Sequence, residues 1–229
     1  MTNKIFFLLL SVMLVMVGCT DEAIVAEKGW MEISRVAFGN AERVIVQTRA
    51  AESEFNVDIY NAAGSKVLSY PAGSVVAGKK IDLATGTYRL HAYTSNYNTT
   101  FAATDPGEAK FAGERTFEVK TDVVTYVEMK VPMVNVAVSL TLPEGFASVF
   151  TSYTFTANIG SRTMVITDGH TAYFDLGDSN TANFTLSAIN ADGETMSQSG
   201  NFAVEAGKNY NVVFAYGNAQ QLSAAVREH

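Results

Sequence analysis

Apolar and polar residues alternate along much of this chain, with apolar side chains on every second position of several short runs. In the first half these apolar positions are Phe55, Val57 and Ile59, then Tyr88, Leu90 and Ala92, then Val127, Met129 and Val131. In the second half they are Val134, Val136, Val138 and Leu140, then Phe184, Leu186 and Ala188, then Tyr210, Val212, Phe214 and Tyr216. Because successive side chains of a strand point to opposite faces, each run predicts a β-strand with one buried face.

Turn-forming sequences separate these runs at residues 61–64, 84–86, 167–169, 190–193 and 206–209. No long stretch with helical periodicity lies between them. Short strands at close intervals are typical of antiparallel sandwiches, whereas α/β folds alternate strands with helices. The pattern therefore predicts an all-β chain. Trp30, the only tryptophan, is expected to pack in the core of the first sandwich.

A domain boundary is predicted near Pro132, because proline cannot donate a hydrogen bond to a sheet and a new strand run begins at Val134. The two resulting β-sandwich domains, residues 26–131 and 133–217, each approach the length of about 100 residues that is typical of one sandwich. So short a link predicts closely apposed domains. Residues 218–229 are polar and alanine-rich, which favours a short helix or a frayed C-terminal tail.

The N-terminus has the features of a signal peptide. Lys4 precedes an apolar run over residues 5–17, which is too short to span a bilayer. The run ends in Gly18 and Cys19, which resembles the bacterial lipobox, although Met16 departs from the usual aliphatic residue. Cys19 is also the only cysteine, so it has no intramolecular disulfide partner. The sequence therefore predicts a signal peptide over residues 1–18, a lipid on Cys19 and a tether over residues 19–25.

Two carboxylates, Asp21 and Glu22, follow Cys19 closely. They resemble the acidic export signal of surface-exposed lipoproteins of the Bacteroidetes, and a generic acidic tether is the alternative. The export reading predicts a protein that is lipid-anchored in the outer membrane and faces the cell exterior.

The charge of the chain argues against nucleic acid as a partner. The net charge of −7 becomes −8 when residues 1–18, with Lys4 and no acidic residue, are removed. No basic cluster offsets this charge anywhere in the sequence, and such a cluster is the footprint of a nucleic-acid-binding protein. The predicted partners are the membrane, through the lipid, and a protein or a glycan.

Catalytic motifs are missing from the sequence. The three histidines, His91, His170 and His229, have no nucleophile motif beside them, and no phosphate-binding glycine loop is present. A triad dispersed along the chain remains open as an alternative, since triads are defined by geometry. We predict no enzymatic activity and no cofactor.

Oxygen ligands for calcium could come from Asp175, Asp178 and Asn180, but their spacing differs from that of a calcium loop. A turn capped by its own Asp and Asn side chains explains them better. We therefore predict no metal site.

The segment 93–101 is the candidate ligand loop. Tyr93, Asn96, Tyr97 and Phe101 combine ring faces for stacking with short polar groups for hydrogen bonds, as adaptable binding loops do. Local packing of the same tyrosines is an equal alternative.

Several stretches together resemble a family of Bacteroidetes surface lipoproteins of unknown function that is similar in style to fimbrillins. These stretches are residues 27–33, 55–60 with Gly64, 83–90, 117–119 and 134–136. The resemblance implies a tandem β-sandwich, transthyretin-like or immunoglobulin-like, on the cell surface. It also implies a role in adhesion, pilus-like assembly or glycan capture.

Arg49-Ala50 resembles the place where fimbrillin-like precursors can be cut after arginine. Such a cut would separate the anchor from most of the first domain, so an anchoring or accessory subunit fits better than a shaft subunit. Three hypotheses follow, in this order: an adhesion or pilus-accessory lipoprotein, a surface glycan-binding lipoprotein, and an uncharacterised hydrolase.

Overall fold

The structure is a computed structural model that describes residues 28–38, 54–74, 80–216 and 222–229. Several predicted features lie outside these residues: the signal peptide, Cys19, Asp21, Glu22 and the bond between Arg49 and Ala50. They remain predictions. No helix among the described residues is long and apolar enough to cross a membrane.

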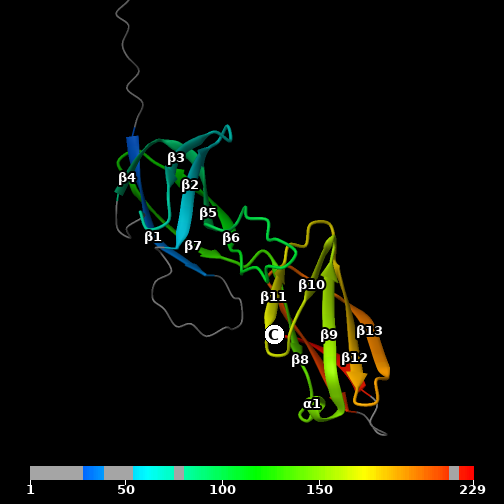
Figure 1. Cartoon of the computed structure of the whole chain (residues 1–229). Coiled ribbons are helices and arrows are strands. Elements are labelled where there is room, and N and C mark those ends of the chain that lie inside the picture. Colours follow the sequence, from blue (N-terminus) through cyan, green and yellow to red (C-terminus); the bar gives the residue numbers. More distant parts are fainter. Residues whose placement is uncertain (1–27, 39–53, 75–79, 217–221) are drawn as a thin grey trace, which may run out of the picture.

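The first half of the chain forms two sheets, which we call the N-terminal sandwich (Figure 1). Its strands are β1 (Lys28–Phe38), β2 (Phe55–Asn61), β3 (Lys66–Tyr70), β4 (Lys80–Ala84), β5 (Gly86–Thr94), β6 (Ala112–Val119) and β7 (Val124–Val131). One sheet has the order β4-β1-β7, and the other has the order β3-β2-β5-β6. Apolar side chains from both sheets meet in one core, where Phe55, Ile59 and Leu90 are fully buried.

The second half forms the C-terminal sandwich. Its elements are β8 (Val136–Thr141), α1 (Phe146–Val149), β9 (Phe150–Ile159), β10 (Arg162–Val165), β11 (Thr171–Phe174), β12 (Thr181–Asn190), β13 (Thr195–Ala203), β14 (Asn209–Tyr216) and β15 (Leu222–Glu228). The sheets have the orders β10-β9-β12-β13 and β11-β8-β14-β15. Phe155, Phe184 and Phe214 form the centre of a second core, with ring centroids about 6 Å apart.

The prediction of an all-β sandwich fold is confirmed. The alternating apolar residues of β2, β5 and β7 face the first core, and those of β8, β12 and β14 face the second. Most strand pairs are antiparallel, but β1 pairs with β7 and β8 pairs with β14 in parallel. Each sandwich is therefore closed by a parallel contact between its first strand and a strand near its end.

A close approach at Gly29 accompanies the first of these parallel contacts. A Cβ atom at this position would lie 2.2 Å from the backbone oxygen of Lys120 and 2.6 Å from Val119 Cγ1. Only glycine fits there without a shift of the backbone.

Two expectations from the sequence are wrong. Residues 222–228 form neither a helix nor a frayed tail, because they pair with β14 as strand β15. Trp30 does not join the first core, since Met31 and Ile33 occupy the buried face of β1 and Trp30 lies on the opposite face, half-buried. We keep residues 26–131 and 133–217 as the proposed domains and extend the second to residue 228, because β15 belongs to its sheet.

Candidate functional site

A buried carboxylate organises the outer face of the sheet β3-β2-β5-β6. Asp58 is 3% exposed, although it lies on the face of β2 opposite the core. Its oxygens accept hydrogen bonds from Ser69 Oγ at 2.5 Å, Lys66 Nζ at 3.2 Å and Tyr93 OH at 3.3 Å. Burial alone would raise the pKa of Asp58, but these donors outweigh it, so the pKa lies below its ordinary value of 3.8.

Three rings lie beside this carboxylate, and we call them the aromatic cluster: His91, Tyr93 and Tyr97. His91 stacks on Tyr93 with ring centroids 4.9 Å apart, and Tyr97 lies 5.7 Å from each of the other two rings. Burial lowers the pKa of His91 below 6.5, against the opposing effect of Glu114. At physiological pH the His91 ring is therefore neutral and can stack against an apolar face.

The chain leaves β5 in turns and irregular structure that end at Lys110, and Asn96 fixes the start of this segment. Asn96 Oδ1 accepts a hydrogen bond from Thr94 Oγ1 at 2.7 Å. Its Nδ2 donates to Ala109 O at 3.1 Å and to Glu108 Oε2 at 3.2 Å. Asn96 thus ties the two ends of the segment together.

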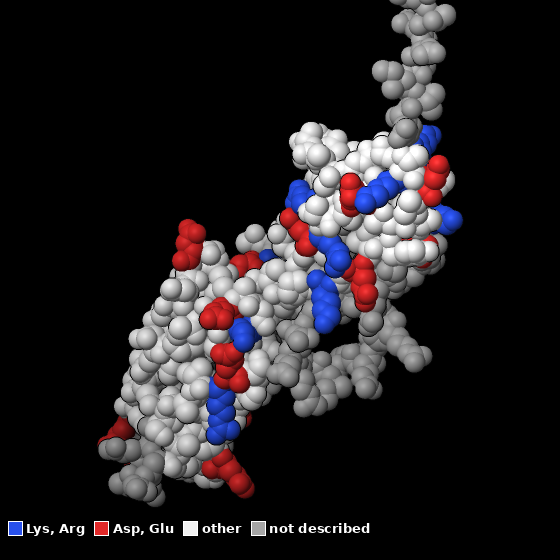
Figure 2. Space-filling view, turned by 180° about the vertical axis from the view of Figure 1, so that it is seen from behind, with Lys and Arg blue, Asp and Glu red and all other residues white. Residues whose placement is uncertain are grey.

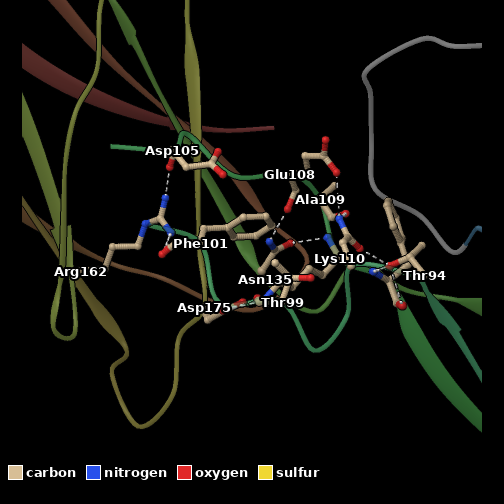
Figure 3. A network of polar contacts seen from close by, with 12 residues as sticks. Thr94, Thr99, Phe101, Asp105, Glu108, Ala109, Lys110, Asn135, Arg162 and Asp175 are labelled. Atoms are coloured by element: carbon tan, nitrogen blue, oxygen red, sulfur yellow. Dashed lines mark hydrogen bonds and ion pairs between the residues drawn. The ribbon is translucent and has the colours of Figure 1, made fainter. Parts of the chain in front are cut away.

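Lys110 joins the two sandwiches (Figure 3). Its side chain is 5% exposed, and its Nζ donates to Thr99 O at 2.6 Å and to Asp175 Oδ2 at 2.7 Å. Asp175 follows β11 directly in the C-terminal sandwich. A buried ammonium is costly without a partner, so this pair holds the segment against the second sandwich.

Phe101 lies between two cations at the same junction (Figure 3). Lys110 Nζ is 4.9 Å from the centre of its ring, and the Arg162 guanidinium is 5.6 Å from it. Arg162 Nη1 also donates to Phe101 O at 3.2 Å, and its Nη2 donates to Asp105 O. Gly107 has a positive φ of 76° and leaves room for this ring, because a Cβ there would lie 2.9 Å from Phe101 Cδ2.

Asn135 anchors the junction from the link between the sandwiches. It is 1% exposed and its Oδ1 accepts a hydrogen bond from Lys110 N at 3.0 Å. Its Nδ2 donates to Glu108 O at 2.8 Å, and its backbone oxygen accepts from Gly207 N at 3.0 Å. Asn135 therefore bonds both sides of the junction, the segment before β6 through its side-chain amide and the second sandwich through its backbone oxygen.

Two hollows open along this junction. One has a volume of about 520 Å³ and is lined by Tyr97, Lys110 and Asp175, among others. The other has a volume of about 610 Å³ and is lined by Phe101, Arg162 and Asp178, among others. Together they form what we call the junction groove.

The residues of the predicted ligand loop separate into two places. The structure brings Tyr93 and Tyr97 together in the aromatic cluster. Asn96 instead forms hydrogen bonds within the segment that follows β5, and Phe101 lies at the junction. Whether any of them contacts a ligand remains a prediction. The sequence pattern assigned His91 no binding role, and it did not indicate the junction residues, which are Lys110, Asn135 and Arg162.

The acidic group considered for calcium is used differently. Asp175 pairs with Lys110, and Asn180 Oδ1 accepts a hydrogen bond from Thr181 Oγ1 at 3.1 Å. Within the described part of the chain, no three His, Cys, Asp or Glu side chains are grouped as metal ligands would be.

Solved structures with a similar fold include proteins from Bacteroides, Porphyromonas and Parabacteroides. The chain is similar to a candidate cell adhesion protein from Bacteroides eggerthii, with 11% identity and a TM-score of 0.52 over 89% of this chain and 96% of that one. It is also similar to the fimbrial anchor protein Mfa2 from Porphyromonas gingivalis, with 11% identity and a TM-score of 0.41 over 87% and 96% of the two chains. A fimbrial assembly protein from Parabacteroides distasonis matches with 10% identity and a TM-score of 0.47 over 87% and 94%.

A search of curated proteins found no match. The profile of one protein family matches residues 27–226, which is most of the chain. The resemblance that the sequence indicated, to a family of unknown function, is confirmed by this match. The chain belongs to the family described as Domain of unknown function (DUF4493).

Proposed function

We propose that this protein is a non-enzymatic lipoprotein of the outer membrane, facing the cell exterior, with an adhesion or fimbria-accessory role of the anchor type. The observation that carries the proposal is the short spacing between the lipobox-like sequence and the first strand. Strand β1 begins at Lys28, only nine positions after Cys19. At about 3.3–3.6 Å per residue, such a tether spans roughly 30 Å at most, so a lipid on Cys19 would hold the first sandwich close to the membrane.

The junction supports a role in which the two sandwiches act as one body. Buried Lys110 and Asn135 bond the segment 95–110 to the second sandwich and to the link. A binding surface on the second sandwich would therefore be held at a defined orientation to the anchor. The fold shared with a candidate cell adhesion protein adds support.

The anchor is tested by replacing the lipidated residue in a Bacteroidetes host. We expect Cys19→Ala to move the protein from the membrane fraction to the soluble fraction, and Asp21→Ala with Glu22→Ala to leave it membrane-bound but protected from protease added to intact cells. Glu27→Ala serves as the matched control. Membrane retention of the Cys19→Ala variant would overturn the anchor.

The role is tested by deleting the gene and measuring how many cells adhere to a surface and how much fimbrial material they shed. We expect a several-fold loss of adherence or increase in shed material, restored by the wild-type chain and not by Cys19→Ala. Unchanged adherence and unchanged shedding would contradict both forms of the proposal.

A surface glycan-binding role is the second candidate, and the aromatic cluster favours it. The ring faces of His91, Tyr93 and Tyr97 lie beside hydroxyl and carboxylate groups, which is the combination used by sites for polar ligands with apolar faces. A glycan array probed with the wild type and with Tyr93→Ala tests it.

A hydrolase remains the third candidate. Among the described histidines, His170 lies in a turn, where its Nδ1 is 3.0 Å from both Thr167 Oγ1 and Asp168 O. His91 lies in the aromatic cluster, where the two side chains that contact its ring are tyrosines. Neither arrangement supplies a nucleophile with an oriented base.

A further inference from the structure

We propose that the junction groove binds a neutral oligosaccharide, with Tyr97 at one end and Asp178 near the other. The two hollows share four lining residues: Thr100, Asp175, Leu176 and Gly177. They are therefore neighbours along one seam and not two separate sites. Figure 3 shows Lys110, Asp175, Phe101 and Arg162 along this seam, where the two sandwiches meet.

The size of the groove suits an extended ligand. Small-molecule sites typically have volumes of about 300–1,000 Å³ and occur preferentially between domains. Each hollow falls within this range, at about 520 and 610 Å³. Two adjoining hollows accommodate a chain of sugar units better than a single compact molecule.

The charge of the lining favours a neutral ligand. Four charged side chains line the two hollows, Lys110 and Arg162 against Asp175 and Asp178, and their formal charges sum to zero. Lys110 and Asp175 are already paired at 2.7 Å, and Arg162 already donates to two backbone oxygens. A charged ligand would have to compete with these contacts, whereas a neutral one would leave them in place.

Short hydroxyl and amide side chains supply the hydrogen bonds that a sugar needs. Those along the groove are Asn98, Thr99, Thr100, Ser161, Thr163 and Ser179. The side chains of Asn98, Thr100 and Ser161 are exposed and have no hydrogen-bond partner among the residues that the structure describes. The half-buried ring of Tyr97 offers an apolar face at the same end as Asn98.

An extended peptide is a poorer occupant, because peptides commonly bind by pairing with the edge of a sheet. Residues 97–100 and 175–179 lie in turns and irregular segments, and only Arg162 and Thr163 of the lining are at the start of an edge strand, β10. The groove therefore offers scattered hydroxyl groups more than a continuous backbone edge.

This inference deepens the proposed adhesion role by naming a ligand class, and binding by purified protein tests it without cells. The probe is an array of neutral oligosaccharides, which are cello-, malto-, manno- and xylo-oligosaccharides, with polygalacturonate as the charged comparison. The protein is used as purified from the cells that make it. Two variants change the groove, Tyr97→Ala and Asp178→Asn, and each has a matched control elsewhere.

The controls are Tyr126→Ala and Asp192→Asn. Tyr126 is 66% exposed on β7, and Asp192 is exposed in the turn between β12 and β13. We expect saturable binding of at least one neutral oligosaccharide, weakened about three- to tenfold by each groove variant and unchanged by either control. Tyr97→Ala removes a ring face, and Asp178→Asn removes an ionised hydrogen-bond acceptor. Circular dichroism verifies that all four variants are folded.

Two outcomes would overturn the inference: no binding of any neutral oligosaccharide by the folded protein, or binding that the groove variants leave unchanged. Loss of adherence on gene deletion together with a negative array would refute the saccharide groove and leave the adhesion role standing. Binding on the array with unchanged adherence would support the saccharide groove and contradict the adhesion role.

Discussion

The two sandwiches share an architecture but differ in the chemistry of their strands. Every strand from β1 to β7 carries at least one charged residue, whereas in the second sandwich only β10, with Arg162, and β15, with Arg227 and Glu228, carry any. Figure 2 shows the same contrast on one face, where acidic and basic side chains are interspersed over the N-terminal sandwich and much of the C-terminal sandwich is free of them.

The outer face of the sheet β10-β9-β12-β13 has hydroxyls and amides where the first sandwich has ion pairs. Thr156, Thr185 and Ser199 lie side by side across three strands, and Asn158, Asn183 and Asn201 form the next row. In the first sandwich the corresponding surface contacts are charged, as in Asp58 with Lys66 and Arg89 with Glu114. The contacts on this face of the second sandwich therefore depend less on pH and salt than the ion pairs of the first sandwich do.

The largest effect is expected from breaking the second core. Phe155 is fully buried between Phe184 and Phe214, so Phe155→Ala should lower the free energy of unfolding by about 3–5 kcal/mol. Trp30 is the only tryptophan and lies in the first sandwich, so its fluorescence reports on that half alone.

We expect urea unfolding of Phe155→Ala to shift part of the circular dichroism transition to lower urea while the Trp30 transition moves less. Val165→Ala, at a 59% exposed position, is the control and should change stability by less than about 0.5 kcal/mol. Equal shifts of both signals would mean that the two halves unfold as one unit.

The next effect concerns the junction. Asp175→Asn leaves the buried Lys110 ammonium with Thr99 O as its remaining acceptor, and we expect a loss of about 2 kcal/mol. The control is Glu228→Gln, which removes the partner of exposed Lys208 and should have a clearly smaller effect. Hydrogen exchange of the backbone amides from residue 105 to 112 measures the local consequence. Unchanged protection there would argue that the ion pair between Lys110 and Asp175 does not hold this segment in place.

A smaller effect should appear in how the stability of the first sandwich depends on pH. The pKa of Asp58 is lower in the folded state than its ordinary value of 3.8. The stability from this carboxylate is therefore present above about pH 4 and is lost as the pH falls toward the folded pKa. Asp58→Asn should remove this part of the acid sensitivity of the Trp30 transition.

Ser69→Ala tests the same carboxylate with its charge retained. It removes the 2.5 Å hydrogen bond to Asp58, so it should reduce the acid-dependent change only in part. If both variants kept the wild-type pH profile between pH 5 and about pH 2, the hydrogen bonds to Asp58 would not be what lowers its pKa.

The smallest effect is expected at His91. Burial lowers its pKa below 6.5, Glu114 opposes this, and Arg89 adds to it. An NMR titration should place the His91 pKa below 6.5, and Glu114→Gln should lower it further, because the opposing charge is lost. Arg89→Met should raise it. A His91 pKa above 6.5 in the wild type would contradict the burial of this ring.

The strands could be predicted because their signal is local. Alternation along β2, β5, β12 and β14 reflects a sheet with one buried face, and the period of two is visible in a single short run. The register of one strand was harder, since Trp30 and Met31 are adjacent and a shift by one residue exchanges the buried face. Only the partner strands decide which of the two is inside.

Strand β15 and the junction could not be predicted for a related reason. The segment LSAAVRE is rich in residues that favour helix, and only pairing with β14 makes it a strand. Lys110 and Asp175 are 65 positions apart, and neither has a neighbouring pattern that marks it as half of a buried pair. Contacts of this kind follow from the packing of two complete sandwiches.

The parallel contact between β1 and β7 has a mechanical consequence. Parallel strands begin at the same end, so Lys28 at the start of β1 and Val131 at the end of β7 lie at opposite ends of the pair. Tension applied between the tether and the second sandwich would pull the two strands past one another along their length. Eight registered positions would then bear the load together instead of opening one after another. If the chain is anchored through Cys19 as proposed, pulling on it would therefore load these backbone hydrogen bonds in shear.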